Sequence, residues 1–358
     1  MNGGGAERQL AYLSGELTRI GWEVHVALLS GGSNMGRLEA SGAVIHKLAV
    51  LHNYDPSILW QLIRIIREVR PDLIQVWLIQ MEILGGIAAE ILRVPWVFSE
   101  RCSTLAYPPK LKNWLRVFIA SRASAIVSNS KGGDQYWQKR LDTRVPRWVI
   151  RNALPLDEIE TAQPATWEEI GLESEQQVVL YVGRFHPHKN LSTLLLALCE
   201  VVSRPGIVAV LCGDGPLQEF IKRRLNEYLI AGRVLLPGYV SAVWNWMKRA
   251  DVFVSVSLFE GHPNAVLEAM ACGCPLVVSD IPSHREFLDD QSALLVNPRA
   301  PATITRAIRS VLSDPEAAKR RVLNARAQAA QWSIPAIARQ YERVYEQVLD
   351  RNKPLRLK

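Results

Sequence analysis

The chain has 358 residues, of which 48% are hydrophobic and 22% charged. This composition is typical of a globular protein and excludes an intrinsically disordered chain. Lys and Arg number 42 and Asp and Glu 35, which gives a net charge of +7. Nucleic acid, an anionic membrane surface and anionic small substrates are therefore all candidate partners. At about 150 residues per domain, the length predicts two domains.

The excess of basic over acidic residues lies in the first half of the chain. Residues 1–155 hold 19 Lys and Arg and 12 Asp and Glu, whereas residues 156–358 hold 23 of each. We therefore expect a polyanion to bind in the N-terminal half. The spacing of the five cysteines matches no zinc pattern, which favours reduced thiols in a cytosolic protein. No run approaches the ~18 apolar residues that a membrane-spanning helix needs.

A glycine loop and a helix open the chain. Gly3, Gly4 and Gly5 precede a stretch with apolar residues at helical spacing: Leu10, Leu13, Leu17 and Ile20. A Rossmann-like domain places a strand before such a loop, and no strand pattern precedes it here. We expect that this first strand is missing or lies upstream of Met1.

Apolar, β-rich runs then alternate with helical stretches. The runs are Trp22–Leu29, Ala43–Leu48, Leu73–Trp77, Val94–Ser99, Ala125–Ser128, Val178–Val182, Ile207–Cys212, Val234–Leu236, Val252–Ser257, Pro275–Ser279 and Ala293–Val296. Many are continuously apolar, as strands are when helices cover both faces of a parallel sheet. The pattern predicts doubly wound α/β domains.

A polar gap at 154–175 separates two groups of runs. It contains two prolines and an acidic cluster but no basic residue, and we interpret it as a hinge. The predicted domains are residues 1–157 and 158–333, both Rossmann-like, followed by a C-terminal segment, 334–358, whose pattern is helical up to Leu349.

The stretch from Pro109 to Ile119 predicts an amphipathic helix in the basic half. Leu111, Leu115, Phe118 and Ile119 form one stripe, and Lys112 and Arg116 share a neighbouring face. Two interpretations stay open: a helix at an anionic membrane surface, or a domain helix that buries its stripe.

The most informative stretch runs from Ser257 to Gly273, where a strand, a Gly/Pro turn and a helix starting near Asn264 follow each other. Free N–H groups at a helix start bind anions. Glu260 lies in the loop and Glu268 eight positions later in the helix, so both carboxylates can face one ligand, such as a ribose diol. Alternatively, Glu260 caps the helix and Glu268 is a surface residue.

A second strand–helix junction, residues 182–190, carries two cations. Gly183 allows close backbone approach, and Arg184 and Lys189 suit a diphosphate. His186 and His188 are more typical of a loop than of a metal site, because no further ligand accompanies them. The turns at 213–216 and 238–240 are generic on their own. No Asp-x-Asp pair is present to hold a divalent cation on a nucleotide diphosphate.

Together these motifs resemble the GT-B-fold retaining glycosyltransferases of family 4. The resemblance rests on Gly-Arg-Phe-His-Pro-His-Lys-Asn at 183–190, Gly-Asp-Gly-Pro at 213–216 and Glu-Gly-His-Pro-Asn-Ala-Val-Leu-Glu-Ala-Met-Ala-Cys-Gly at 260–273. It extends to residues 275–280, 286 and 295–296, and in the first domain to 4–8, 129–130 and 149–152. It implies a GT-B architecture of two Rossmann-like domains, with the final helix crossing back onto the first.

The resemblance also implies roles for residues on the donor side. Arg184 and Lys189 would hold the donor diphosphate, Glu268 the ribose hydroxyls, and Glu260 would lie beside the transferred sugar. Transfer would be metal-independent, with retention at the anomeric carbon and no cofactor. The catalytic residues would be Glu260, Arg184 and Lys189, and the wider donor site would add Gly183, Gly213, Tyr239, Val240, Gly261, His262, Asn264, Ala265, Val266 and Glu268.

The acceptor side departs from the family pattern. Where many members have a histidine after the strand at 94–99, this chain has Glu100 and Arg101. Arg101 would clamp a lipid diphosphate or form a surface salt bridge, and Gly4 and Gly5 would approach the diphosphate and acceptor. His262 replaces a usually apolar residue and would tune the choice of donor sugar.

The leading interpretation is a hexosyltransferase-type enzyme of class EC 2.4 that uses a nucleotide sugar, and the donor we expect is a UDP-sugar. Its acceptor would be a glycan or a polyprenyl-diphosphate-linked sugar in the synthesis of cell-surface polysaccharide, such as lipopolysaccharide. It would be cytoplasmic, peripheral on the inner face of the membrane, and would not bind nucleic acid. The alternatives are a GT-B epimerase or phosphorylase, and a non-catalytic nucleotide-sugar or glycan-binding module.

Overall fold

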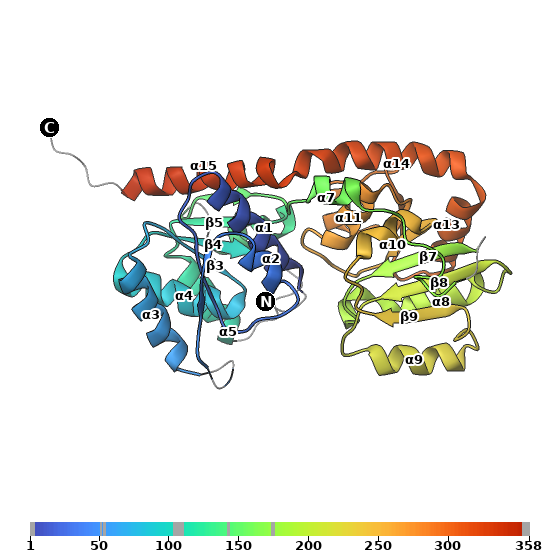
Figure 1. Ribbon diagram of the computed structural model, residues 1–358, viewed down its shortest axis with the longest axis horizontal. Helices are drawn as coiled ribbons and strands as arrows, with labels where there is room; N and C mark the ends of the chain where they lie inside the picture. The colour runs from blue at the N-terminus through green and yellow to red at the C-terminus, as the bar shows by residue number, and fades with distance from the viewer. Residues whose placement is uncertain are drawn as a thin grey trace. The chain divides into compact units, whose positions relative to one another are not determined.

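The computed structural model of the protein describes residues 4–50, 52, 55–102, 111–141, 144–172 and 176–352 (Figure 1). The chain divides into two compact units: residues 1–153 with 332–358 form unit 1, and residues 154–331 form unit 2. The sequence analysis places the corresponding boundaries at 157 and 333. No described helix has the length and apolar character required to cross a membrane.

Unit 1 is built on parallel strands. In its described part, β1 (His25–Leu28) pairs with β2 (Val44–Lys47), and a second sheet has the order β3-β4-β5-β6. The strands of this second sheet are β3 (Ile74–Trp77), β4 (Trp96–Glu100), β5 (Ala125–Ser128) and β6 (Arg147–Val149). The sequence analysis missed β6, because three half-buried residues that begin with arginine give no apolar run.

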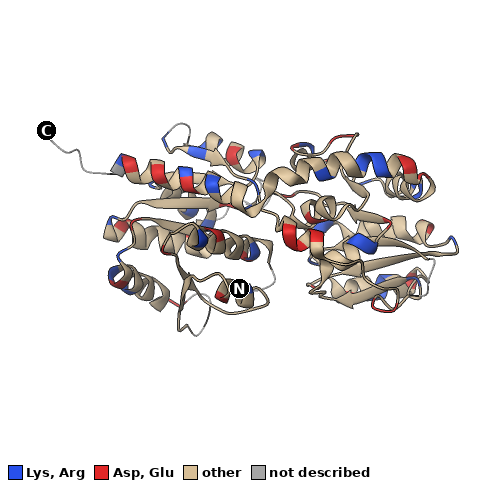
Figure 2. Ribbon diagram, turned by 45° about the horizontal axis from the view of Figure 1, so that its top comes forward, with Lys and Arg blue, Asp and Glu red and all other residues tan. Residues whose placement is uncertain are grey.

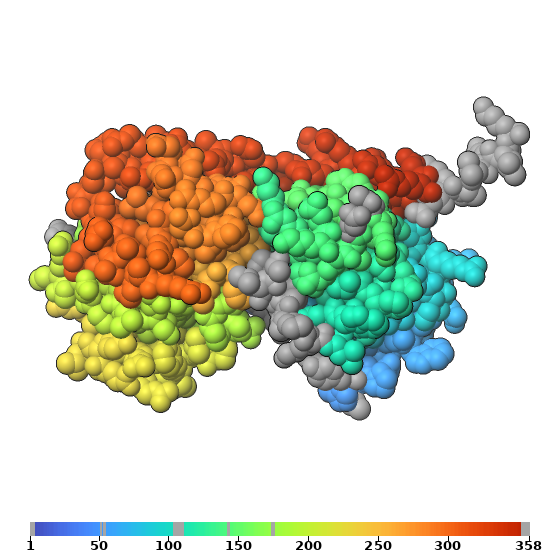
Figure 3. Space-filling view, turned by 180° about the vertical axis from the view of Figure 1, so that it is seen from behind, coloured from blue at the N-terminus to red at the C-terminus, as the bar shows by residue number. Residues whose placement is uncertain are grey.

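Helices cover these sheets. Those described in unit 1 are α1 (Gly5–Arg19), α2 (Met35–Glu39), α3 (Ser57–Val69), α4 (Ile79–Leu92), α5 (Leu111–Ala120), α6 (Lys131–Leu141) and α15 (Ile334–Asn352). The final helix, α15, packs into the core of unit 1: Ile337 and Val344 share a buried cluster with Leu13 and Leu17 of α1. In the space-filling view its red atoms lie against the green part of this unit (Figure 3). Blue and red residues alternate along its outer side (Figure 2).

A buried charge cluster fixes α5 to unit 1. The Arg116 guanidinium has no exposed surface and pairs with Glu82 of α4 and with Glu100 of β4, the latter at 2.7 Å. Burial raises the pKa of Glu82 to about 7, although the positive charge of Arg116 opposes the rise. The sequence pattern places Arg116 with Lys112 on a face beside the apolar stripe and does not indicate that Arg116 is buried. A guanidinium can be buried here because two carboxylates accept its hydrogen bonds.

Unit 2 contains a six-stranded, fully parallel sheet in the order β12-β11-β10-β7-β8-β9. Its strands are β7 (Gln177–Val182), β8 (Ile207–Cys212), β9 (Val234–Gly238), β10 (Val252–Ser255), β11 (Leu276–Ser279) and β12 (Leu294–Val296). The strand order reverses between β7 and β10. In open α/β sheets, ligands bind at such a reversal, beyond the carboxyl ends of the strands.

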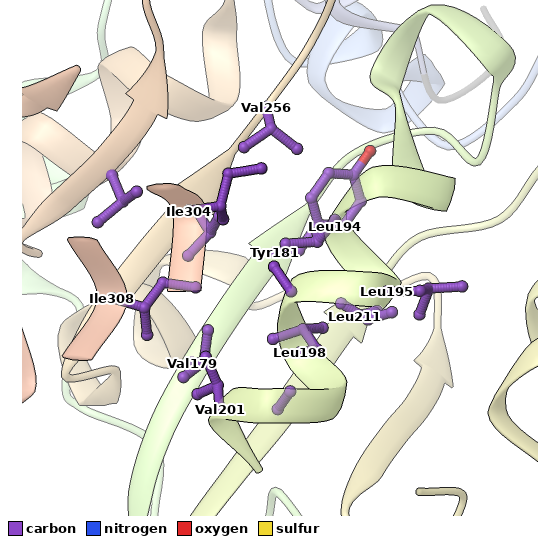
Figure 4. Packing of buried hydrophobic residues seen from close by; sticks show 14 of the residues in the cluster. Val179, Tyr181, Leu194, Leu195, Leu198, Val201, Leu211, Val256, Ile304 and Ile308 are labelled. Carbon is purple, nitrogen blue, oxygen red and sulfur yellow. The ribbon is translucent and has the colours of Figure 1, made fainter. Parts of the chain in front are cut away.

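Apolar side chains from the sheet and from helices on one face form the core of unit 2. Figure 4 shows Val179 and Tyr181 of β7 facing Leu194 and Leu198 of α8. The described helices of this unit are α7 (Leu156–Thr161), α8 (Leu191–Val201), α9 (Gln218–Glu227), α10 (Val243–Arg249), α11 (Asn264–Cys272), α12 (Pro282–Arg285), α13 (Pro301–Ser313) and α14 (Pro315–Ala329), with a 3-10 turn at Pro187–Lys189. A further 3-10 turn, Ala330–Trp332, contains the chain boundary between the two units. The two domains of parallel α/β type confirm the predicted fold class.

Candidate functional site

The loops that follow β7 and β10 meet at the strand reversal of unit 2. Lys189 comes from the first loop and Glu260 from the second, and Lys189 Nζ lies 2.5 Å from Glu260 Oε1. Ser257 Oγ donates a second hydrogen bond to the same oxygen at 2.7 Å. The structure thus brings together two residues that are 71 positions apart and that the sequence analysis assigned to one site.

This ion pair keeps the carboxylate of Glu260 charged. The two side chains are 20% and 10% exposed, and burial by itself raises the pKa of Glu260. The charge of Lys189 and the hydrogen bonds from Lys189 and Ser257 outweigh burial, so the pKa of Glu260 lies below its ordinary value. At neutral pH the site therefore holds a shielded, ionised carboxylate beside a cation.

The backbone around Lys189 is fixed by its neighbours. Asn190, in a left-handed conformation with φ of 58°, donates from Nδ2 to the carbonyl oxygens of Val256 and Pro298. The Leu258 N–H donates to the His188 carbonyl at 2.8 Å. These bonds hold the Lys189 loop against the end of β10. The sequence analysis gave Asn190 no role.

Two glycine turns lie beside this loop. Gly213, with φ of 142°, has the Gly183 carbonyl oxygen 2.0 Å from the position that a Cβ would occupy. The Gly183 N–H donates to the Cys212 carbonyl, and the Gly213 N–H to the Gly238 carbonyl. These contacts show that the turns after β7, β8 and β9 are packed side by side. Because they are packed so closely, only glycine fits at position 213. Arg184, next to Gly183, is exposed.

Helix α11 begins at Asn264, as the sequence predicts, with Pro263 as its N-cap. Its first residues, Asn264 and Ala265, follow Gly261 and His262 at the carboxyl edge of the sheet, whereas the N–H of Val266, a predicted donor contact, donates to the Pro263 carbonyl at 3.1 Å. Glu268, one turn later, is 3% exposed and accepts a hydrogen bond from Trp244 Nε1 at 3.1 Å. The interpretation of Glu268 as a surface residue is therefore wrong. Trp244 is a neighbour that the sequence did not indicate.

Two buried histidines flank the Glu260 loop. The His262 ring is 3% exposed and packs edge-on against Phe287, with ring centroids 5.1 Å apart. His284 is fully buried, and its Nδ1 lies 2.7 Å from the Ser279 carbonyl oxygen. Burial lowers the pKa of His284, so its imidazole is neutral at pH 7. His284 was missed because a histidine outside the motifs carries no sequence signal.

The predicted donor residues Tyr239 and Val240 line an open cavity of about 570 Å³. Trp246, Asn245 and Glu169 also contribute to its wall. Tyr239 is 59% exposed. Lys189, Glu260 and Glu268 do not line this cavity, although Trp244, which donates to Glu268, lies in the same helix as Asn245 and Trp246.

His186 and His188 contact each other in the Lys189 loop, with their Nδ1 atoms 2.6 Å apart. Burial, followed by the charge of Lys189, lowers the pKa of His188 to about 4. No group of three or more His, Cys, Asp or Glu side chains in the described residues is arranged to hold a metal ion.

The residues expected on the acceptor side lie in unit 1. Gly4 is the N-cap of α1 and Gly5 is its first residue. Glu100 is fully buried, with Oε1 accepting from the Cys102 N–H and Oε2 from Arg116 and from Trp137. Neither oxygen faces solvent, so the structure gives Glu100 a structural role in place of the expected contact with an acceptor.

Arg101 is held in place by unit 1. Its Nη1 donates to the Tyr341 hydroxyl at 3.1 Å and its Nη2 to Asn152 Oδ1 at 2.7 Å. The guanidinium carbon lies 4.3 Å from the centre of a Trp77 ring. None of these partners is an acid, and within the described part of the chain Arg101 forms none of the ion pairs, so the surface salt bridge considered for it is not seen there.

Two known protein families match this chain, one in each half. The family described as Glycosyltransferase Family 4 matches residues 3–158, and the family described as Glycosyl transferases group 1 matches residues 163–328. The chain belongs to glycosyltransferase family 4, group 1. The segment from Glu260 to Glu268 and the Lys189 loop both lie within the second match.

The names of two similar bacterial proteins specify a lipid-linked sugar as the acceptor. The UDP-Gal:alpha-D-GlcNAc-diphosphoundecaprenol alpha-1,3-galactosyltransferase of Escherichia coli is 28% identical over 241 residues, which are 63% of this chain and 62% of that protein. The N-acetylgalactosamine-N,N'-diacetylbacillosaminyl-diphospho-undecaprenol 4-alpha-N-acetylgalactosaminyltransferase of Campylobacter jejuni is 28% identical over 232 residues, 64% of this chain and 62% of that protein. The chain thus spans under two thirds of the length of either relative.

The fold matches solved structures over nearly the whole chain. Anabaena HepE in complex with UDP-glucose superposes with a TM-score of 0.85 at 21% identity, and the match covers 96% of both chains. This likeness concerns the fold, and it identifies the two α/β domains of this family 4 member as the GT-B architecture.

Proposed function

We propose that this family 4 member is a glycosyltransferase that moves a sugar from a nucleotide-sugar donor, a UDP-sugar, to a lipid-linked acceptor during the assembly of a cell-surface polysaccharide. One observation carries the proposal: the Lys189–Glu260 pair lies at the strand reversal of unit 2, next to the start of α11. The named activities of the two bacterial relatives, and the UDP-glucose bound by HepE, support the substrate classes.

Lys189 and Arg184 are the residues we assign to the donor diphosphate. In the free protein the charge of Lys189 is directed at Glu260. A bound diphosphate would add a second anion to this cation, and each charge-assisted hydrogen bond is worth about 1.5–3 kcal/mol. The first N–H groups of α11 would contribute a partial positive charge to the same anion. We propose that these groups make a divalent metal unnecessary and that no cofactor takes part.

Glu260 and Glu268 would act on the two ends of the donor. Glu268, held by Trp244 in the first turns of α11, would accept hydrogen bonds from the ribose hydroxyls. Glu260 is ionised and shielded, which suits a carboxylate beside the transferred sugar, where positive charge develops at the anomeric carbon. In the reaction, the bond from this carbon to the diphosphate oxygen breaks and a bond to the acceptor oxygen forms. We propose that the anomeric configuration is retained and that the acceptor proton leaves with the diphosphate.

On the acceptor side, we assign Arg101 to an anionic group of the acceptor. Its guanidinium is oriented by Tyr341 and Asn152 and has no carboxylate among these partners. Gly4 and Gly5 at the start of α1 offer backbone N–H groups in the same unit. A polyprenyl-diphosphate acceptor would bring the protein to the inner face of the cytoplasmic membrane.

The test is a transfer assay that measures UDP release from UDP-sugars with undecaprenyl-diphosphate-linked acceptors, with and without EDTA. We expect transfer that EDTA does not abolish, a lower kcat for Glu260→Gln, and weaker donor binding for Glu268→Gln. Glu219→Gln, at a side chain of unit 2 that is 81% exposed, is the control and retains activity. Unchanged transfer in both site variants would contradict the proposed roles, and UDP binding without any transfer would favour a non-catalytic module.

A further inference from the structure

A series of buried hydrogen bonds connects α12 to the Glu260 carboxylate. His284 Nδ1 lies 2.7 Å from the Ser279 carbonyl oxygen and 3.3 Å from Ser279 Oγ. Ser279 Oγ in turn lies 2.7 Å from the Ser257 carbonyl oxygen. Ser257 Oγ then lies 2.7 Å from Glu260 Oε1. His284, Ser279 and Ser257 are each 0% exposed, so these bonds form within the protein interior at the carboxyl ends of β10 and β11.

The direction of these hydrogen bonds follows from the groups that take part. A carbonyl oxygen only accepts, so the neutral His284 ring carries its proton on Nδ1, and the Ser279 hydroxyl donates to the Ser257 carbonyl. The other ring nitrogen of His284, Nε2, is buried and has no hydrogen-bond partner among the described residues. A second proton would therefore be a buried donor without an acceptor. Burial, which lowers the pKa of His284, favours the same neutral form.

Ser257 is the residue through which this series reaches Glu260. Its hydroxyl donates to the carboxylate oxygen that also accepts from Lys189, and both bonds lower the pKa of Glu260. A serine side chain has three staggered rotamers, and a change of rotamer would break the bond to the carboxylate. The bond from Ser279 Oγ to the Ser257 carbonyl fixes the backbone from which the Ser257 hydroxyl extends.

Aromatic packing makes a second connection between His284 and the same loop. The Phe287 ring packs edge-on against His284 and against His262, with ring centroids 6.2 Å and 5.1 Å apart. His262 follows Glu260 by two residues, whereas Ser257 precedes it by three. The His284 ring therefore supports the Glu260 loop on both sides of the carboxylate.

We infer that His284 is a positioning residue for Glu260. Acting through the Ser279 and Ser257 hydroxyls, it holds the carboxylate in one orientation beside the transferred sugar. Small errors in the placement of a reacting group are costly for turnover. The inference rests on the proposed function of Glu260 and assigns a role to a residue outside the donor motifs. Because His284 and Ser279 have no exposed surface, they act through Glu260 and not by contact with the donor.

Transfer kinetics and UDP binding test this inference in the full-length protein. His284→Leu removes the Nδ1 donor and Ser279→Ala removes the hydroxyl. Each should lower kcat at least about tenfold, the effect of losing one hydrogen bond to a charged group. The dissociation constant for UDP should stay the same, because UDP lacks the sugar that Glu260 is proposed to contact. His284→Asn should retain most of the kcat, since its amide N–H can replace the donor on Nδ1.

The matched control is Thr305→Val. Thr305 is 2% exposed, and its hydroxyl donates to the Ala197 carbonyl in the core of unit 2. This variant loses the same kind of buried hydrogen bond as Ser279→Ala and should lose stability as that variant does, but it should keep its kcat. In a Glu260→Ala background no carboxylate is left to position, so His284→Leu should not lower kcat further.

Unfolding followed by calorimetry at several pH values gives a measurement that does not depend on transfer. Because the pKa of Glu260 lies below 4.5, its ionised form stabilises the fold above that pH, and this contribution is lost as the pH falls through the folded-state pKa. In His284→Leu the weaker bond from Ser257 should raise this pKa, so less stability is lost on acidification.

Three results would overturn the inference. One is a kcat in His284→Leu and Ser279→Ala equal to that of Thr305→Val. Another is an equal effect of His284→Leu on kcat with and without the Glu260 carboxylate. The third is a pH dependence of unfolding in His284→Leu that matches the unchanged protein. UDP binding without any transfer in the unchanged protein would contradict the proposed function, and the pH dependence of unfolding would then still decide the inference.

Discussion

Removal of the Lys189 charge is the most informative single perturbation of the site. In Lys189→Met the side-chain volume is nearly kept, but Glu260 loses the cation 2.5 Å from its carboxylate. A half-broken ion pair costs about 3–5 kcal/mol when fully buried and about 0–1 kcal/mol when exposed. The side chains here are 20% and 10% exposed, so we expect a loss of about 2 kcal/mol at pH 7. At about 2–4 °C per kcal/mol, the melting temperature of unit 2 falls by about 4–8 °C.

The pH dependence of stability should also change sign. In the unchanged protein the pKa of Glu260 lies below the ordinary value of 4.5, so the pair stabilises the fold above that pH and the contribution is lost as the pH falls below it. In Lys189→Met, burial still raises the pKa of Glu260, but the cation that lowers this pKa is gone. The pKa of Glu260 then rises above 4.5, and the variant gains stability as the pH falls from 7 toward 5.

Thermal unfolding followed by calorimetry, with and without UDP, measures both effects. Lys222→Met is the control, since Lys222 forms a 2.9 Å pair with Glu219 in which both side chains are at least half exposed, and it should stay within about 0.5 kcal/mol of the unchanged protein. The double variant Lys189→Met/Glu260→Gln should regain part of the loss, because the amide still accepts from Ser257. A loss of stability in Lys189→Met no larger than that in Lys222→Met would show that the Lys189–Glu260 pair does not stabilise unit 2.

Three further predictions concern unit 1. Burial raises the pKa of Glu82 from 4.5 to about 7, so between these pH values the folded state holds a proton that the unfolded state has lost. The free energy of unfolding should therefore fall as the pH rises from 4.5 to about 7. Urea unfolding at several pH values measures this slope, which should be flatter in Glu82→Gln. Arg116→Met leaves Glu82 and Glu100 without their shared cation, and the free energy of unfolding at pH 7 should drop by about 3–5 kcal/mol in the same assay. Leu78 has φ of 69° and is 44% exposed, so Leu78→Gly should be about 1 kcal/mol more stable than Leu78→Ala, the reverse of the usual order.

The fold could be predicted from the sequence because its strands are buried on both faces. Val252–Ser255 and Leu276–Ser279, for example, are buried at every position, which produces continuous apolar runs. β6 could not be found in this way because all three of its residues are only half buried. The pairing of Lys189 with Glu260 was predictable only because the motif of each loop indicates the same ligand.

The parts that the sequence did not reveal depend on long-range packing. Arg116 looks like a surface residue of an amphipathic helix until Glu82 and Glu100 are placed beside it by α4 and β4. The sequence left open whether the stripe of this helix is buried, and the structure divides it, with Ile119 buried and Leu111 and Phe118 exposed. His284 contributes through a bond to the Ser279 carbonyl, and no residue spacing predicts such a bond.

Calorimetric titration of the full-length protein with UDP in the presence of EDTA tests the central claim most directly. We expect saturable binding that EDTA leaves unchanged. The dissociation constant should be at least about tenfold higher in Glu268→Gln, because this variant loses a hydrogen bond to a charged group. Glu219→Gln should bind as the unchanged protein does. Absence of UDP binding, or binding that EDTA abolishes, would contradict a metal-independent nucleotide-sugar site at the strand reversal of unit 2.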